Sequence, residues 1–308
     1  MTAIRAEAEQ AVVNTVSYVD AFDYPLTPAE IHRYLVRLSL SPGELHRILD
    51  NGRLVPHRLS YRDGLYMLPG RESVAEIRRE RQRVAARLWP GAIHHARLIA
   101  RMPFVRMVAV TGSLAVNNVG PREDIDYLVV TADDHLWVSR AFVLLIVRWA
   151  ARQGIELCPN YFLSERALRF TEQNLYTAHE VVQMVPLYGL PVYDALRRVN
   201  NWTQRFLPNA SGAPSLPAHV AGLRRNLGRL PARSAVEAAF ATPLGRSLDR
   251  WEMTRKIRKF QRVYQGWQES DFSADQCKGH FSLHQQRALT AYAGRVGLSE
   301  EVTLGTSV

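Results

Sequence analysis

The chain has 308 residues, of which 47% are hydrophobic and 22% are charged, and its formal net charge is +10. This composition is typical of a globular protein and argues against a largely disordered chain, while the length allows two or three domains. The positive charge favours an anionic partner, such as a nucleic acid, a nucleotide or an acidic acceptor, without choosing among them.

The N-terminus and the apolar runs bear on where the protein resides. Residues 1–10 contain charges and no apolar run, so we expect no secretory signal, and residues 141–147, the longest apolar run, are too short to cross a bilayer. Two cysteines, Cys158 and Cys277, cannot by themselves form a disulfide framework or a thiolate metal site. We therefore expect a soluble, cytoplasmic protein without a membrane partner.

Residues 4–70 predict three short helices followed by a two-stranded hairpin. Thr27-Pro28-Ala29-Glu30 and Ser41-Pro42-Gly43-Glu44 are capping boxes with proline at the first helical position, and Asp63-Gly64 is a hairpin turn. This order resembles a winged helix-turn-helix domain, whose third helix enters the major groove in DNA-binding members. Here the third helix has only His46 and Arg47 as basic groups that could reach DNA, so DNA binding and a docking role both stay open.

Residues 72–87 are dense in arginine and glutamate and predict an exposed connecting helix whose charges are solvated.

Two predicted strands, residues 104–110 and 125–131, enclose a glycine turn at Thr111-Gly112-Ser113. Asp124 and Asp126 are two positions apart and therefore leave the same face of the second strand. Carboxylates this close repel each other unless a cation neutralises them. Mg²⁺ suits this role, because it binds one or two carboxylates together with substrate phosphates, and Gly112 lets backbone amides approach those phosphates.

Gly112-Ser113, followed about ten residues later by Asp124-Ile125-Asp126 at the head of a strand, resembles the signature of the DNA polymerase β-like nucleotidyltransferase superfamily. The resemblance covers roughly residues 104–163. It implies that Asp124 and Asp126 hold Mg²⁺, or alternatively Mn²⁺, on a nucleoside triphosphate whose phosphates contact Gly112 and Ser113. The alternative is a surface turn followed by a solvated acidic strand start.

A third carboxylate is expected on the next strand, residues 155–163, which a helix over residues 135–153 connects to the strand that Asp124 and Asp126 begin. Such a crossover makes the two strands parallel, so their starting ends lie together. Glu156 is at the start, whereas Asn160 is about 13 Å farther along. We therefore expect Glu156 to be a catalytic residue and metal ligand, although the superfamily most often has aspartate there. Its role as a base, as a ligand or only as an exposed charge stays open.

The C-terminal half predicts mostly helices. In the helix expected over residues 172–185, Tyr176, His179 and Gln183 share a face that either lines a nucleotide base or packs into the core. Farther along, Lys278 and His280 flank Gly279 in a break between helices, and we expect them to reach the phosphates of the nucleotide, with a role as proton carrier as the alternative.

The sequence as a whole predicts an α+β fold with an N-terminal winged helix, a small mixed-sheet nucleotidyltransferase-like core and a helical C-terminal half. The expected divisions are residues 1–70 (winged helix), 71–103 (connecting helix), 104–207 (core), 208–217 (linker) and 218–308 (helical domain).

The predicted function is transfer of a nucleoside monophosphate from a nucleoside triphosphate to an unidentified acceptor, a small molecule, RNA or protein, with release of pyrophosphate. The alternative is a winged-helix DNA-binding regulator with a catalytically inactive, nucleotide-sensing domain.

Overall fold

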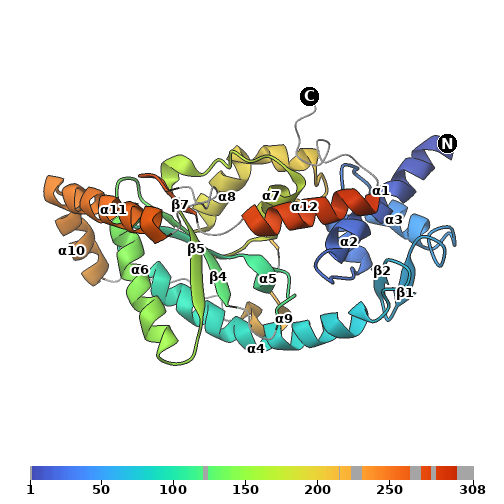
Figure 1. Cartoon of the computed structure of the whole chain (residues 1–308), viewed down its shortest axis with the longest axis horizontal. Helices are drawn as coiled ribbons and strands as arrows, with labels where there is room; N and C mark the ends of the chain where they lie inside the picture. Colours follow the sequence, from blue (N-terminus) through green and yellow to red (C-terminus); the bar gives the residue numbers. More distant parts are fainter. Residues whose placement is uncertain are drawn as a thin grey trace.

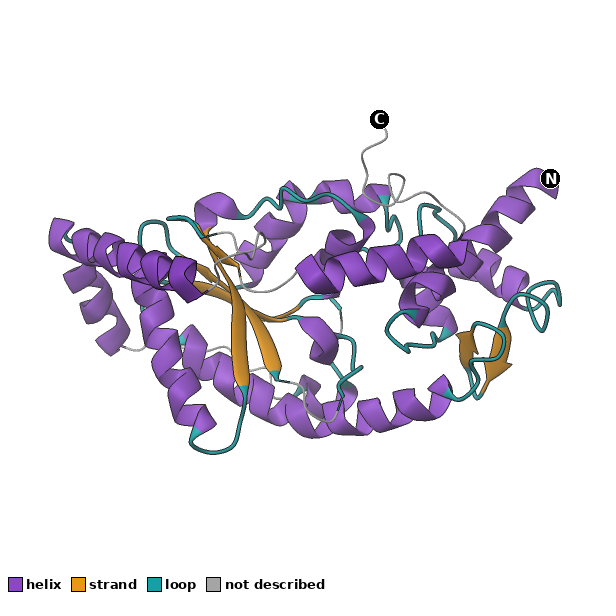
Figure 2. Ribbon diagram, in the orientation of Figure 1, coloured by secondary structure: helices purple, strands orange, loops and turns teal. Residues whose placement is uncertain are grey.

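The computed structural model describes residues 2–120, 124–214, 216–222, 231–263, 272–278 and 282–296. Helices and strands are mixed along the chain, and five strands form one mixed sheet, so the predicted α+β class is confirmed (Figures 1 and 2). Within these residues, every helix is too short or too polar to pass through a bilayer.

The N-terminal part has the predicted order of three helices and a hairpin. Both capping boxes are present: the Thr27 side chain accepts from Glu30 N while Glu30 Oε2 accepts from Thr27 N, and Ser41 and Glu44 repeat this exchange. The hairpin turns at Asp63 and Gly64, both at positive φ. The elements are α1 (Thr2–Asp20), α2 (Pro28–Arg33), α3 (Pro42–Leu49), β1 (Ser60–Arg62) and β2 (Leu65–Met67).

Helix α4 (Val74–Ala100) runs from this hairpin to the sheet along one side of the molecule (Figure 1). The sequence predicted that the charges of this helix are solvated, but not all of them are. Arg78 is buried, lies over the ring of Tyr24 at 4.5 Å and forms an ion pair of 2.8 Å with Glu30. The first half of α4 therefore binds the N-terminal helices, and its second half covers the sheet.

The sheet has the strand order β6-β3-β4-β5-β7. Among the strands that the structure describes, only β4 and β5 pair in parallel, and α6 (Leu136–Ala151) connects them, which confirms the predicted crossover. The edge strand β7 comes from the region predicted as a break between helices and pairs antiparallel with β5. The strands are β3 (Val105–Val110), β4 (Ile125–Thr131), β5 (Leu157–Ser164), β6 (Val185–Tyr188) and β7 (Gln276–Lys278).

Alternate residues of the central strands enter two separate cores. Tyr127 and Val129 pack with Trp89 of α4, whereas Leu128 and Val130 pack with residues of α7 and α8 on the other face. The remaining elements are α5 (Gly112–Ala115), η1 (Glu165–Ala167), α7 (Leu175–Gln183), α8 (Leu190–Val199), η2 (Asn201–Arg205), α9 (Ala218–Ala221), α10 (Pro231–Phe240), α11 (Pro243–Val263) and α12 (Ser282–Val296).

A third core joins the two ends of the chain. Val12 and Val16 of α1 belong to the same buried cluster as Val182 of α7 and Leu289 of α12, and α1 and α12 lie side by side (Figures 1 and 2). The predicted boundary at residue 70 stays a prediction, but apolar packing is continuous across it. The segment predicted as a linker is also held in place, because Arg33 donates to the carbonyls of Ser211 and Gly212.

Candidate functional site

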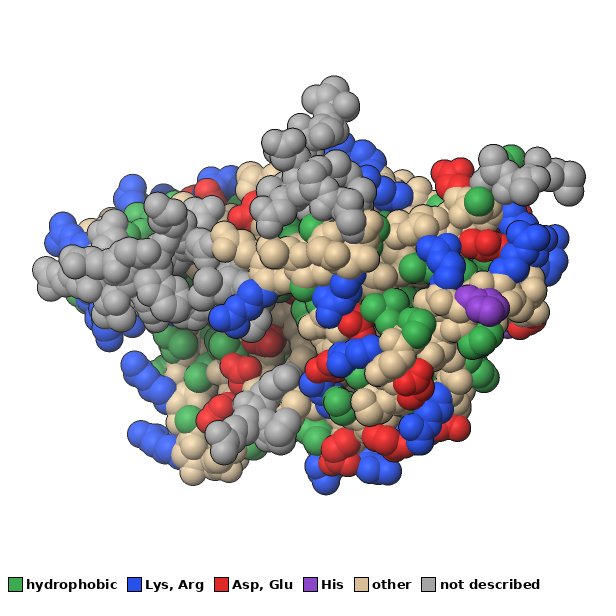
Figure 3. Space-filling view, turned by 45° about the vertical axis from the view of Figure 1, so that its right-hand side comes forward, with side chains coloured by type: hydrophobic (Ala, Val, Ile, Leu, Met, Phe, Trp, Pro, Cys, Tyr) green, Lys and Arg blue, Asp and Glu red, His purple; other side chains and the backbone are tan. Residues whose placement is uncertain are grey.

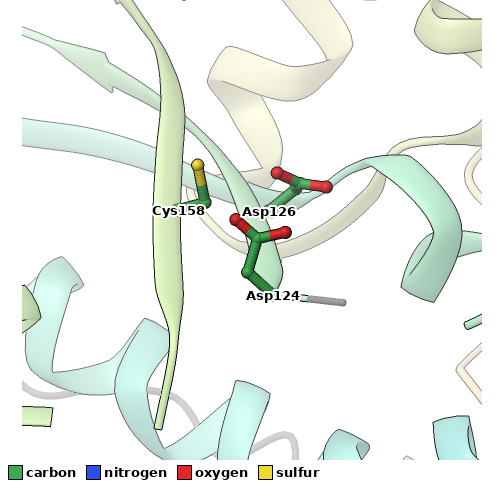
Figure 4. A group of neighbouring side chains, drawn as sticks. All are labelled: Asp124, Asp126 and Cys158. Atoms are coloured by element: carbon green, nitrogen blue, oxygen red, sulfur yellow. The ribbon is translucent and has the colours of Figure 1, made fainter. Parts of the chain in front are cut away.

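Asp124 and Asp126 stand at the start of β4, beside the turn that follows β3. Because Val110 pairs with Tyr127 and Thr111 N donates to Asp126 O at 3.1 Å, the glycine turn falls directly against Asp126. Figure 4 shows the carboxylates of Asp124 and Asp126 close together, beside the side chain of Cys158 on β5. One ligand atom from each of these three residues lies within 4.8 Å of the other two.

Gly112 is required here by both its backbone and its surroundings. Its φ of +62° lies in the left-handed region that side chains disfavour. A Cβ at this position would stand 2.4 Å from Asp126 Oδ2, so any other residue would displace that carboxylate. The glycine signature and the aspartate signature are therefore parts of a single site.

Cys158 occupies the third position of this group, and the prediction of Glu156 as a metal ligand is corrected. Asp126 pairs with Cys158 across the parallel strands, whereas Glu156 precedes the first paired residue, Leu157. The Glu156 side chain is exposed, and its carbonyl accepts from Ile125 N at 3.0 Å. Strand pairing therefore does not hold this side chain against the aspartates, and it is not among the described residues that line the cavity above them.

Asn160, which the spacing argument had set aside, contacts the aspartates instead. Its Nδ2 donates to Asp126 Oδ1, and Cys158 Sγ donates to Asn160 Oδ1 at 2.6 Å. The pairing of β4 with β5 shifts between Asp126 and Leu128, which brings Asn160 closer to Asp126 than a regular strand would. Burial, and then Asp124 and Asp126, raise the pKa of the Cys158 thiol well above its ordinary value, so the thiol stays a hydrogen-bond donor.

A cavity of about 630 Å³ opens over the aspartates, a size typical of small-molecule sites. Its lining comes from the starts of β4 and β5, the end of α1 with the loop after it, α4, the segment that begins with the turn at Gly112 and Ser113, and α7. Gly112 and Ser113 thus line the same cavity as the aspartates, and their contact with a nucleotide stays a prediction. The N-terminal loop is held against the turn segment by Asn118, whose Nδ2 donates to Phe22 O at 3.0 Å.

Helix α7 turns a polar face toward this cavity. Tyr176, His179, Glu180 and Gln183 all line it, at the spacing of one helical face. His179 is buried, stacks on Tyr18 at 4.3 Å and accepts from Gln183 at Nδ1, and burial lowers its pKa to about 3, so the ring is neutral. The face predicted from Tyr176, His179 and Gln183 is therefore a cavity wall. Glu180 shares this helical spacing, which could have identified it from the sequence, but it was not among the predicted residues.

Arg81 of α4 is the one cationic side chain that the structure describes among the cavity residues. It donates to Phe22 O at 2.7 Å and to Asn118 Oδ1 at 3.2 Å, which holds its guanidinium at the cavity wall. The charges of this helix were predicted to be solvated, and no local pattern in the sequence distinguishes Arg81 from its neighbours.

Lys278 is not brought to the aspartates. It lines a second, smaller cavity of about 30 Å³, and its Nζ forms an ion pair of 3.0 Å with Glu172. The two cavities adjoin, because Tyr176 and Glu180 line both. His280, predicted together with Lys278, lies outside the residues that the structure describes.

Comparisons of the chain with models of protein families, with curated proteins and with solved structures found no significant match. The function is therefore argued from the geometry of this cavity.

Proposed function

We propose that this chain is a metal-dependent nucleotidyltransferase that moves a nucleoside monophosphate from a nucleoside triphosphate to an acceptor and releases pyrophosphate. One observation carries the proposal: two carboxylates, Asp124 and Asp126, converge beside a glycine turn at the base of a cavity large enough for a nucleotide. Paired carboxylates next to a glycine turn are what a metal-bound triphosphate requires.

The donor set fits a hard divalent cation. Asp124 and Asp126 would hold Mg²⁺ or Mn²⁺, since both cations prefer carboxylate oxygens and a protonated thiol is a poor ligand for them. Such a cation stabilises the charge that develops on the phosphate oxygens. Asn160 orients Asp126 through its amide, as an outer partner of a metal ligand does.

Other groups of the cavity are assigned to the nucleotide. Gly112 and Ser113 lie beside the aspartates and are proposed to contact the phosphates, and Arg81 supplies positive charge on the facing wall. The neutral, stacked ring of His179 belongs to a wall that suits a nucleobase.

We propose that the three N-terminal helices and hairpin are a winged helix in a docking role. Residues Tyr18 to Tyr24 form part of the cavity wall. In α3, His46 and Arg47 contact the carbonyls of Pro42 and Gly43 in their own helix. Lys/Arg and Asp/Glu side chains are intermixed over the N-terminal part of the face in Figure 3, unlike the one-sign surface that DNA binding needs.

The second candidate function is a DNA-binding regulator that senses a nucleotide without turning it over. Cys158 favours it, because a protonated thiol stands where this chemistry usually has a third carboxylate.

Pyrophosphate release distinguishes the two functions. The protein is incubated with each common nucleoside triphosphate and Mg²⁺ or Mn²⁺, with water or candidate hydroxylated acceptors, and products are identified by mass. Release that needs the cation supports the transferase. Nucleotide binding without release, together with sequence-specific binding to duplex DNA, supports the regulator.

Lys278→Ala is expected to change the affinity for a nucleoside triphosphate by less than about twofold, because Lys278 pairs with Glu172 outside the main cavity. Calorimetric titration with a non-hydrolysable triphosphate and Mg²⁺ measures this affinity. Arg81→Ala is the comparison, since the Arg81 side chain lines the main cavity. The affinity of this variant for the triphosphate should be about tenfold lower than that of wild type. A larger loss with Lys278→Ala than with Arg81→Ala would return Lys278 to the nucleotide site.

A further inference from the structure

Glu180 is a carboxylate of the cavity to which the functions above assign no task. It belongs to the polar face of α7, which turns toward the cavity, while Ala178, Val181 and Val182 of the same helix enter the apolar cores. Helix packing therefore determines that Glu180 faces the cavity. It also lines the smaller cavity beside Lys278, so it stands where the two meet.

Within the part of the chain that the structure describes, no hydrogen bond or ion pair compensates the burial of the Glu180 carboxylate. Burial raises its pKa to about 7, and a carboxyl group with this property in a cavity is a candidate for proton transfer at neutral pH.

The other ionisable groups at the cavity have separate tasks or partners. Those that face it from other elements are Tyr18, Asp23, Tyr24, Arg81, Asp124, Asp126 and Cys158. Asp23 pairs with Arg71 and, at 3.5 Å, with Arg81. The low pKa of His179 prevents that ring from accepting a proton near neutral pH. In the smaller cavity, Glu172 and Lys278 neutralise each other.

The wall of Glu180 and the aspartates are connected through Tyr176. Burial, then Glu180, Tyr18 and Asp126, raise the pKa of the Tyr176 hydroxyl. Tyr176, Glu180 and Asp126 line the same cavity, so a substrate that spans from the aspartates to α7 would pass Glu180.

We propose that Glu180 is the general base that accepts the proton of the acceptor hydroxyl. This inference rests on the proposed function. As the O–H bond breaks, the proton moves to a Glu180 carboxylate oxygen, and the hydroxyl oxygen forms a bond to the α-phosphorus. The bond from the α-phosphorus to the bridging oxygen breaks, and pyrophosphate leaves with that electron pair. Glu180 then releases its proton to solvent. Glu180 thereby supplies the base that neither Cys158 nor the exposed Glu156 provides at the aspartates.

The test compares Glu180→Gln with the wild-type protein. Pyrophosphate release from each common nucleoside triphosphate is measured with Mg²⁺, with water and with the candidate hydroxylated acceptors, from about pH 5.5 to about pH 9. We expect wild-type turnover to rise with pH and to level off above the pKa of Glu180, about 7. Glu180→Gln should lower turnover about 100-fold or more, because glutamine cannot accept the proton. The levelling-off of turnover above that pKa should also disappear from its pH profile.

Two controls separate proton transfer from binding and folding. The affinity of Glu180→Gln for a non-hydrolysable triphosphate with Mg²⁺ should stay within about twofold of wild type. Glu172→Gln removes a carboxylate that lines only the smaller cavity and should keep the wild-type pH profile. The pKa of Glu180 is 4.5 in the unfolded chain and about 7 in the folded chain. The free energy of unfolding should therefore fall as the pH rises between these two values, and Glu180→Gln should remove this fall.

Three outcomes would overturn the inference. If the wild-type protein is active and Glu180→Gln keeps turnover within about threefold of it, the inference is overturned while the proposed function stands. A loss of turnover matched by an equal loss of nucleotide affinity would make Glu180 a binding residue. A wild-type protein that binds the analogue and releases no pyrophosphate from any triphosphate would overturn the proposed function as well.

Discussion

Replacing Asp126 by Asn is expected to lower metal-dependent pyrophosphate release by at least about 100-fold, because loss even of a residue behind a metal ligand costs about 10-fold to 100-fold. Asp126 is held on three sides, by Gly112, Asn160 and Cys158, and asparagine nearly preserves its shape while removing the charge. Steady-state kinetics with Mg²⁺ and Mn²⁺ measure the loss.

The thermal midpoint provides a second measurement on the same variant. Without a divalent cation, Asp126→Asn should be as stable as wild type or slightly more stable, since one of two neighbouring like charges is gone. Added Mg²⁺ should raise the midpoint of wild type and not that of the variant. Asp50→Asn, an exposed position on the N-terminal part, is the charge-matched control. Full turnover in both Asp124→Asn and Asp126→Asn would disprove the metal site.

Gly112→Ala is expected to damage both stability and activity. Left-handed backbone at alanine costs about 1 kcal/mol of unfolding free energy, and the new Cβ would stand 2.4 Å from Asp126 Oδ2 and push that carboxylate away. Chemical denaturation should show a loss of about 2 kcal/mol or more, and turnover should fall about tenfold to 100-fold.

Gly64→Ala is the matched control for the backbone term. Gly64 also has positive φ, at +83°, but a Cβ there would meet nothing within 4 Å. Gly64→Ala should lose only the unfolding free energy that left-handed backbone costs at alanine, and it should keep wild-type kinetics. Equal effects of the two substitutions on stability and on activity would show that Gly112 is not pressed against the aspartate.

Local patterns determined the elements of this protein and half of its candidate site. Capping boxes, a hairpin turn and apolar strand segments depend on interactions within a few residues, so α2, α3, β1–β2 and the β4-α6-β5 crossover could be predicted. For the same reason, the two-residue alternation of a strand was enough to bring Asp124 and Asp126 to one side.

Only the tertiary structure decided which distant side chains complete the cavity. The pairing of β4 with β5 placed Cys158 beside Asp126, and the register shift that follows brought Asn160 there. Both depend on pairing between strands, which the spacing of residues does not encode. Arg81 and Glu180 face the cavity because α4 and α7 pack their apolar residues elsewhere. Which way a helix turns its polar face is settled by the cores it joins, and these bring together segments more than 150 residues apart.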